Sequence, residues 1–142
     1  SQTMNFFIVL IPLFISACSS LTFHKNMEYN YQLDQGHNGI YTLKIEPKKS
    51  SALGVTEVAE LFQFNNCMKR EGKVHNLLQS NYDKDKNTIS LQFKCGLTNK
   101  YQRNTIVDIA LSICLKKDMY NDTKLFCQET LPIAKKWKKA HK

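Results

Sequence analysis

Cysteine and histidine are the residues of this chain with the widest chemical range, and neither type is spaced for catalysis. The chain has five cysteines and four histidines. No two cysteines show the C-x-x-C spacing of a zinc site, and no histidine stands at ligand spacing from a cysteine. The motifs of serine hydrolases and of Gly-rich phosphate loops are absent as well. The sequence therefore predicts a non-enzymatic protein that carries no metal and no cofactor.

The histidines and carboxylates form no obvious acid–base set. His24, His37 and His141 fall in a predicted tether, a turn and the C-terminus, where we expect solvent around them. His75 begins a predicted strand and has no serine or cysteine nucleophile in a recognisable context nearby. Carboxylates distant in sequence can still meet in a fold, so an enzyme acting on cell-envelope polymers stays open as an alternative function.

Four of the cysteines are predicted to form two disulfides. An even number of cysteines in an exported domain is typical of a disulfide framework, because an oxidising compartment lets the bonds persist. Three pairings are possible. Joining cysteines that are neighbours in sequence closes short loops between adjacent elements, and each such bond stabilises a fold by about 3–4 kcal/mol in the chain-entropy view. The favoured pairing is Cys67 with Cys95 and Cys114 with Cys127.

The fifth cysteine, Cys18, follows an apolar segment with the features of an export signal. The apolar run Phe6–Ile15 belongs to the segment MNFFIVLIPLFISAC, which begins at the expected initiator Met4. Such a run extends only about 18 Å as a helix, whereas the hydrocarbon core of a bilayer is about 30 Å thick. The length is that of the apolar core of a secretory signal.

The tetrapeptide Ile15-Ser16-Ala17-Cys18 resembles the lipobox of bacterial lipoproteins. The resemblance implies a diacylglyceryl group on the Cys18 thiol, cleavage by type II signal peptidase between Ala17 and Cys18, and acylation of the new amino terminus. The segment departs from the family in one respect, because no Lys or Arg precedes its apolar run. Ser19 and Ser20 follow the cysteine, which in that family implies sorting to the outer membrane, with the protein facing the periplasm.

These features divide the chain into three parts. Residues 1–17 comprise the residues before Met4 and the signal peptide, residues 18–27 are the lipidated cysteine and a tether, and residues 28–142 form one periplasmic domain. The formal net charge is +8, and the signal has no charged side chain. Because nucleic acid is normally absent from the periplasm, this charge favours an acidic protein partner or an anionic membrane surface over a nucleic acid.

The densest basic feature is a possible binding patch near the C-terminus. A tryptophan flanked by lysines suits a head-group layer, an acidic protein surface, or a solvated chain end with no partner. The patch consists of Lys135, Lys136, Trp137, Lys138 and Lys139.

The first half of the domain shows clear periodicities. Alternation on both sides of a Gly/Asn turn predicts a hairpin of Tyr29–Leu33 with Ile40–Ile45. Apolar residues at spacings of three and four then predict a helix over Val55–Arg70, with Gly72 as its cap. Two further strands are predicted over Val74–Tyr82 and Thr88–Cys95, on either side of a charged turn. The expected use of the hairpin tyrosines is packing in the core and at the sheet edge.

The second half is ambiguous. Residues 105–115 alternate strictly and are rich in β-branched side chains, which favours a strand, although helical spacing also fits. A returning strand, Lys124–Thr130, and a short basic helix, Ile133–Lys139, would complete the domain. The predicted fold is α+β, with one main helix on an antiparallel sheet of five or six strands, cystatin-like in topology only.

The predicted location, fold and net charge of the protein, rather than a catalytic motif, indicate its function. The first hypothesis is a non-catalytic binding lipoprotein that acts as an inhibitor or as an immunity protein against an effector working in the periplasm. Its partner would present an acidic surface. The second hypothesis is a structural subunit of an envelope-spanning secretion or conjugation complex.

Overall fold

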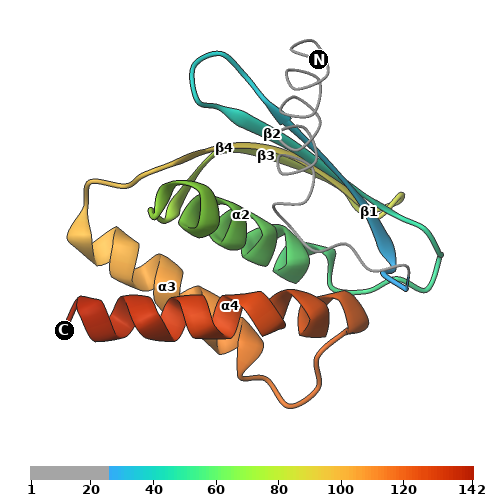
Figure 1. Ribbon diagram of the computed structural model, residues 1–142. Coiled ribbons are helices and arrows are strands. Elements are labelled where there is room, and N and C mark those ends of the chain that lie inside the picture. The colour runs from blue at the N-terminus through green and yellow to red at the C-terminus, as the bar shows by residue number, and fades with distance from the viewer. Residues whose placement is uncertain (1–25) are drawn as a thin grey trace, which may run out of the picture.

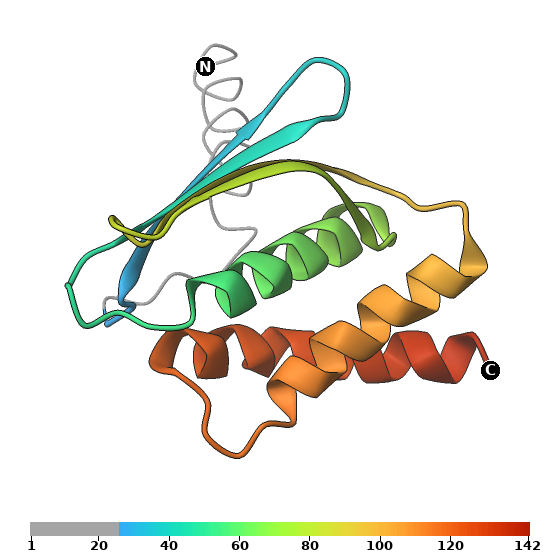
Figure 2. The same ribbon diagram turned by 180° about the vertical axis from the view of Figure 1, so that it is seen from behind.

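The structure, a computed structural model, describes residues 26–142, which form four strands and three helices. The predicted signal peptide, the cleavage point at Ala17 and Cys18, and most of the tether lie outside the described residues. Figure 1 shows three layers: a curved sheet, one helix beneath it, and two helices on the far side of that helix. Seen from behind, the order of the layers is the same (Figure 2). The predicted α+β class with a helix on an antiparallel sheet is confirmed.

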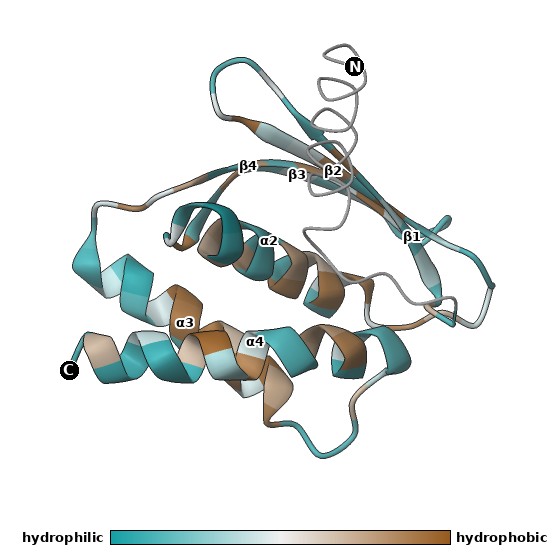
Figure 3. Ribbon diagram, in the orientation of Figure 1, coloured by the Kyte–Doolittle hydropathy of each residue, from teal (hydrophilic) through white to brown (hydrophobic). Residues whose placement is uncertain are grey.

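The sheet contains two antiparallel hairpins joined side by side. Strands β1 (Tyr29–Gln35) and β2 (Tyr41–Pro47) form the first hairpin, and β3 (His75–Asp83) and β4 (Thr88–Cys95) form the second. The spatial order is β1-β2-β4-β3, so β2 and β4 are central and β1 and β3 are the edges. The predicted hairpin is confirmed, and so are the two further predicted strands, which pair with each other. On the central strands, buried apolar residues alternate with exposed polar residues. Figure 3 shows the resulting mixture of hydrophobic and hydrophilic colours along the sheet.

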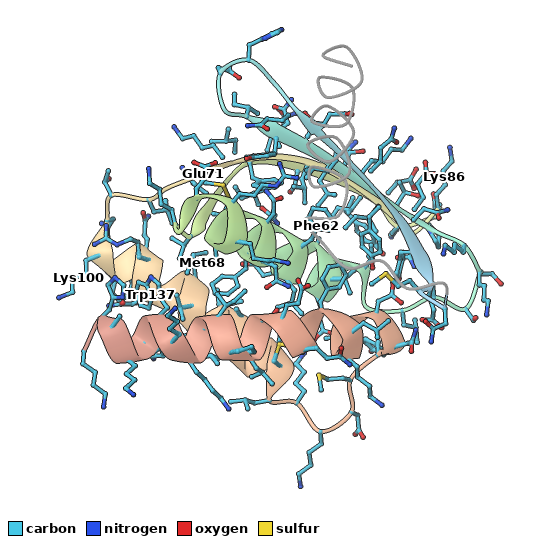
Figure 4. The ribbon with its side chains drawn as sticks, viewed as in Figure 1. Phe62, Met68, Glu71, Lys86, Lys100 and Trp137 are labelled. Carbon is cyan, nitrogen blue, oxygen red and sulfur yellow. A yellow bond between two sulfur atoms is a disulfide. The ribbon has the colours of Figure 1, made fainter. Side chains whose placement is uncertain are left out.

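Helix α2 (Val55–Glu71) is the predicted main helix and packs against the inner face of the sheet. Its last turn carries Lys69 and Arg70, which interact favourably with the helix dipole. Gly72 ends the helix at φ 66°, and its N–H donates to the Met68 carbonyl. This left-handed conformation costs glycine little, because glycine has no Cβ. Phe62, fully buried on α2, lies at the centre of the molecule (Figure 4).

The predicted strand over residues 105–115 is wrong, because this segment lies in helix α3 (Lys100–Cys114). The buried positions of α3 are Val107, Ala110, Ile113 and Cys114, which follow helical spacing. Two alternating apolar residues that a strand would have turned inward, Ile109 and Leu115, are instead exposed. The helix begins at Asn99, whose side-chain oxygen accepts a hydrogen bond from the Gln102 N–H. Packing against other helices therefore overrides the β propensity of this segment.

The predicted strand Lys124–Thr130 is also wrong, because it belongs to helix α4 (Asn121–Ala140). The predicted helix Ile133–Lys139 is the second half of the same helix. Pro132 had suggested a helix start, but it lies inside α4 with its side chain exposed. Loss of these two strands leaves a sheet of four rather than five or six, and three helices rather than one main helix and a short one.

Both predicted disulfides are confirmed. Cys67, near the end of α2, is bonded to Cys95, the last residue of β4, with their Cα atoms 5.2 Å apart. Cys114, the last residue of α3, is bonded to Cys127 on α4, with a Cα–Cα distance of 5.5 Å. The first bond attaches the helix to the sheet, and the second attaches the two outer helices to each other. The contact between α2 and the outer helices is not covalent and depends on packing, mainly of α2 against α4.

A buried carboxylate attaches the first strand to the outer layer. Asp122, in the first turn of α4, is fully buried. It accepts hydrogen bonds from the backbone N–H groups of Glu28 and Tyr29, at 2.7 and 3.1 Å, and from the Tyr31 hydroxyl at 2.6 Å. Burial and this hydrogen bond raise the pKa of the Tyr31 phenol. The Asp122 cluster therefore holds the start of the domain, where the tether would join it. The confirmed packing role of Tyr29 and Tyr41 is separate, since both rings are buried in the core.

Candidate functional site

A long solvent-exposed surface lies along edge strand β3. From Leu77 to Asp83 every residue of this strand is exposed. A register shift between Leu77 and Gln79 leaves Leu78 without a partner on β4. Edge strands usually discourage pairing with other chains by means of lysine or proline, but β3 has neither, and its one acid is the final Asp83. Apart from the bulge, the edge is open to another extended chain.

A hollow of about 290 Å³ adjoins the beginning of this strand. Tyr101, on the first turn of α3, is 78% exposed, and Leu77 is 47% exposed, so two large apolar side chains stand beside it in water. We call this feature the apolar hollow. It is lined by His75, Asn76, Leu77, Leu97, Tyr101, Gln102, Thr105 and Ile106.

His75 is the one buried titratable side chain that lines the apolar hollow. The residue is only 1% exposed, and its Nε2 lies 2.8 Å from Oε1 of Glu60 on α2. Because an ionised carboxylate can only accept, Nε2 carries the proton that is shared with Glu60. The other ring nitrogen, Nδ1, is buried and has no hydrogen-bond partner among the described residues. Phe64 packs edge-on against the ring.

The His75–Glu60 pair has the orientation of a base and its supporting acid, but lacks a nucleophile. Thr105 supplies a hydroxyl group to the apolar hollow, and that hydroxyl donates to the Tyr101 carbonyl at 2.9 Å. Within residues 26–142, no hydrogen bond joins His75 to a serine, threonine or cysteine. The same part of the chain contains no group of three or more His, Cys, Asp or Glu side chains placed to hold a metal ion.

A second depression lies on the other side of Leu97, which lines both features. Its volume is about 250 Å³, and its charged lining side chains, Lys73 and Arg103, are both cationic. We call it the basic pocket. It is lined by Gly72, Lys73, Val74, Gly96, Leu97, Arg103, Trp137 and His141.

The predicted C-terminal patch is divided by the structure. Lys135, Lys136, Lys138 and Lys139 are exposed on α4, whereas Trp137 is only 8% exposed. Figure 4 places Trp137 between α4 and the beginning of α3, not on the outer surface of the molecule. Its indole is covered by the His141 ring, with 3.9 Å between centroids and an interplanar angle of 11°. The indole is thus packed against protein in this structure, while the four lysines around it remain accessible to an acidic or anionic surface.

A third depression, of about 540 Å³, lies at the far end of β3 and is bordered by Tyr82 and Tyr120. Its charged groups are Glu57 and Lys116, which form an ion pair with each other. The hydrogen bond to Glu57 raises the pKa of the Lys116 ammonium. Because these two charged groups are already paired with each other, the depression presents fewer unpaired charges to a ligand than the basic pocket does.

Sequence reasoning missed both binding features. His75 was recognised without its partner Glu60, and Trp137 was placed on the surface. One signal in the sequence could have placed His75 near the main helix, namely the predicted Cys67–Cys95 bond. This bond holds the end of the main helix beside Cys95, and Cys95 is the residue of β4 that pairs with His75. The basic pocket also needs the position of α3, which had been predicted as a strand.

Neither the apolar hollow nor the basic pocket can be compared with a site in a related protein. Within residues 26–142 no helix combines the length and apolarity needed to cross a bilayer. The chain matches no protein-family model, no curated protein and no solved structure.

Proposed function

We propose that the chain is a non-catalytic, protein-binding lipoprotein of the outer membrane that faces the periplasm. We propose further that it inhibits its partner, as an inhibitor or immunity protein does against an effector acting in that compartment. Cys18 would carry the lipid, and the domain from residue 28 onwards would carry the binding surface. The observation that supports binding most strongly is the apolar hollow, with Tyr101 and Leu77 exposed beside an open sheet edge.

Three properties of that surface suit a protein partner. Exposed aromatic side chains next to a preformed hollow resemble the centres of protein interfaces, where tyrosine is enriched. The open edge of β3 offers backbone N–H and C=O groups to an extended segment of a partner. The two disulfides hold the elements around the hollow, so little ordering entropy is lost on binding. A rigid face of this kind can block a cleft without any chemistry of its own.

Replacing Tyr101 by alanine is expected to weaken partner binding by at least about 30-fold, which corresponds to a hot-spot loss of about 2 kcal/mol. Tyr101 is mostly solvated, so the same change should alter the free energy of unfolding by less than about 0.5 kcal/mol. The measurement is affinity purification from detergent-solubilised envelopes, with mass spectrometry of the partner, followed by titration of the purified pair. Leu115→Ala is a matched control, because Leu115 is 68% exposed at the opposite end of α3. Equal affinity of the Tyr101→Ala and parent proteins would contradict the proposed surface.

Replacing Cys18 by alanine is expected to move the protein from the membrane fraction to the soluble periplasmic fraction. The reason is the loss of the thiol that would carry the diacylglyceryl group, since several acyl chains together hold a protein in a bilayer almost permanently. Metabolic labelling with a fatty acid and cell fractionation measure the change. Labelling of the Cys18→Ala protein to the parent level would contradict lipidation at this residue.

A further inference from the structure

We propose, on the basis of the protein-binding function proposed above, that the basic pocket binds a carboxylate group of the partner protein. The proposal is based on two cationic side chains, Arg103 and Lys73, that line one pocket beside the apolar hollow. The stacked rings of Trp137 and His141 line the same pocket and are called its floor. Leu97 separates the apolar hollow from the basic pocket and lines both. A partner with an apolar side chain in the hollow could therefore place a neighbouring acidic group in the pocket. The site combines charge recognition with apolar burial.

Arg103 is positioned to recognise a carboxylate rather than to support the fold alone. Its Nη1 donates to the carbonyl oxygens of Leu97 at 2.9 Å and of Thr98 at 2.6 Å. These two bonds orient the guanidinium group at the pocket wall. Among the described residues, Nη2 has no hydrogen-bond partner, and no carboxylate lines the pocket. A guanidinium with free N–H groups and a fixed plane suits the planar geometry of a carboxylate.

Lys73 provides the second positive charge. No ion pair joins its ammonium to an acidic group within residues 26–142. Its side chain passes close to Gly96, where a Cβ would lie 3.6 Å from the lysine Cδ. Gly96 has φ 116°, a conformation that residues with a side chain disfavour. Because glycine has no side chain, the backbone of Gly96 itself lines this side of the pocket. Two unpaired cations at one small pocket attract an anion more strongly than the same charges spread over the surface.

The floor of the pocket is formed by two stacked aromatic rings. The His141 ring stacks on the Trp137 indole, and His141 Nδ1 lies 2.8 Å from the Trp137 carbonyl oxygen. Because a carbonyl oxygen can only accept, Nδ1 is the donor, and Nε2 is left without a partner in the described part of the chain. Because the Trp137 indole is only 8% exposed, its part of the floor is apolar, which strengthens the attraction between the two cations and a bound carboxylate.

The walls are also preformed. Gly72 follows the end of α2, Gly96 follows the end of β4, and the Cys67–Cys95 bond joins these two elements. Figure 1 shows the beginning of α3 beside the C-terminal end of α4. These two segments supply the lining residues Arg103, Trp137 and His141. A protein carboxylate is favoured over a lipid phosphate because the adjoining apolar hollow is built from side chains that suit a polypeptide. The net charge of +8 is in keeping with an acidic partner.

Trp137 makes a direct test possible, because it is the single tryptophan of the chain. The full domain is titrated with four probes while indole emission is recorded. N-acetylleucine presents a terminal carboxylate, N-acetylaspartate α-methylamide presents a side-chain carboxylate, N-acetylleucinamide is a neutral control, and inorganic phosphate represents a phosphate head group. At least one carboxylate is expected to change the emission saturably, with a dissociation constant of about 1 mM, and the amide is expected to have no effect.

Two variants locate the binding. Arg103→Gln and, independently, Lys73→Gln are each expected to weaken carboxylate binding about tenfold or more, while Lys135→Gln, on the exposed side of α4, leaves it unchanged. A response to N-acetylleucine alone identifies a partner's chain terminus, and a response to the aspartate derivative alone identifies an acidic side chain; both support the proposal. No saturable response to either carboxylate up to about 50 mM, or a response to phosphate only, would overturn it.

The outcome is independent of the proposed partner binding itself. If Tyr101→Ala abolishes partner capture while no carboxylate binds, the protein-binding function stands and the carboxylate site is rejected. If carboxylates bind the basic pocket while Tyr101→Ala leaves capture intact, the pocket stands and the apolar hollow is rejected as the contact surface.

Discussion

Replacing Asp122 by alanine is expected to lower the free energy of unfolding by about 3–5 kcal/mol. The change leaves the N–H groups of Glu28 and Tyr29 and the Tyr31 hydroxyl without their acceptor. Each orphaned buried donor costs about 1–3 kcal/mol, and part of that cost is recovered where water can enter. Urea unfolding followed by circular dichroism measures the change.

Two further variants test the cause of this loss. Tyr31→Phe removes one donor and should cost about 1–2 kcal/mol. Asp118→Ala removes an exposed acid just before α4 and should change the unfolding free energy by less than about 0.5 kcal/mol. Hydrogen exchange of the Glu28 and Tyr29 amides should accelerate in Asp122→Ala before global unfolding. An Asp122→Ala protein as stable as Asp118→Ala would contradict the role of this carboxylate.

The second large effect is expected from the Cys67–Cys95 disulfide. The bond joins residues 28 apart, and the chain-entropy relation assigns such a loop roughly 3.6 kcal/mol. For a domain of this size, the Cys67→Ala/Cys95→Ala double variant should melt about 10–15 °C lower than the parent protein. Thermal unfolding with and without a thiol reductant measures the difference.

The second disulfide provides an internal comparison. Cys114 and Cys127 are only 13 residues apart, so removal of their bond should cost slightly less, roughly 3 kcal/mol. A variant with all four cysteines replaced should melt at the same temperature with and without reductant. If the parent protein also melts at one temperature under both conditions, the disulfides contribute nothing measurable and the exported, oxidised state of the domain is in doubt.

The elements of the first half were predictable because local signals agree with tertiary structure there. The hairpin Tyr29–Leu33 with Ile40–Ile45 alternates and turns at Gly39, and the helix Val55–Arg70 ends at Gly72. In each case the period, the turn residue and the buried face point to one structure. The structure extends these elements by one or two residues at their C-terminal ends and begins β2 at Tyr41, one residue later than predicted.

Residues 105–115 show where local signals fail. Their alternation matches a strand and their spacing of three and four matches a helix, so no local rule decides between the two. The decision comes from packing, chiefly against α4, in a helix that buries Val107, Ala110 and Cys114. Leu115, which follows that helix, lies in water. Because α4 was itself divided at Pro132 in the sequence prediction, the element that resolves the ambiguity was missing. The division of α4 in the sequence prediction therefore left the ambiguity of residues 105–115 unresolved.

The disulfide pairing was nevertheless predicted correctly, even though both elements around Cys114 and Cys127 were assigned wrongly. The pairing was based on loop closure, which depends on separation along the chain and not on the type of element. The contacts of His75 with Glu60 and of Asp122 with the first strand could not be predicted in the same way. They join residues from different layers, and only the packed arrangement of those layers brings them together.

Hydrogen exchange of the domain, alone and in complex with its captured partner, tests the central proposal most directly. If the partner binds across Leu97, exchange should slow at the beginning of β3, residues 75–78, and from the link after β4 into α3, residues 97–106. The β1–β2 hairpin should exchange at the same rate in both states. Protection confined to that hairpin, or to the outer face of the sheet, would contradict the proposed binding surface.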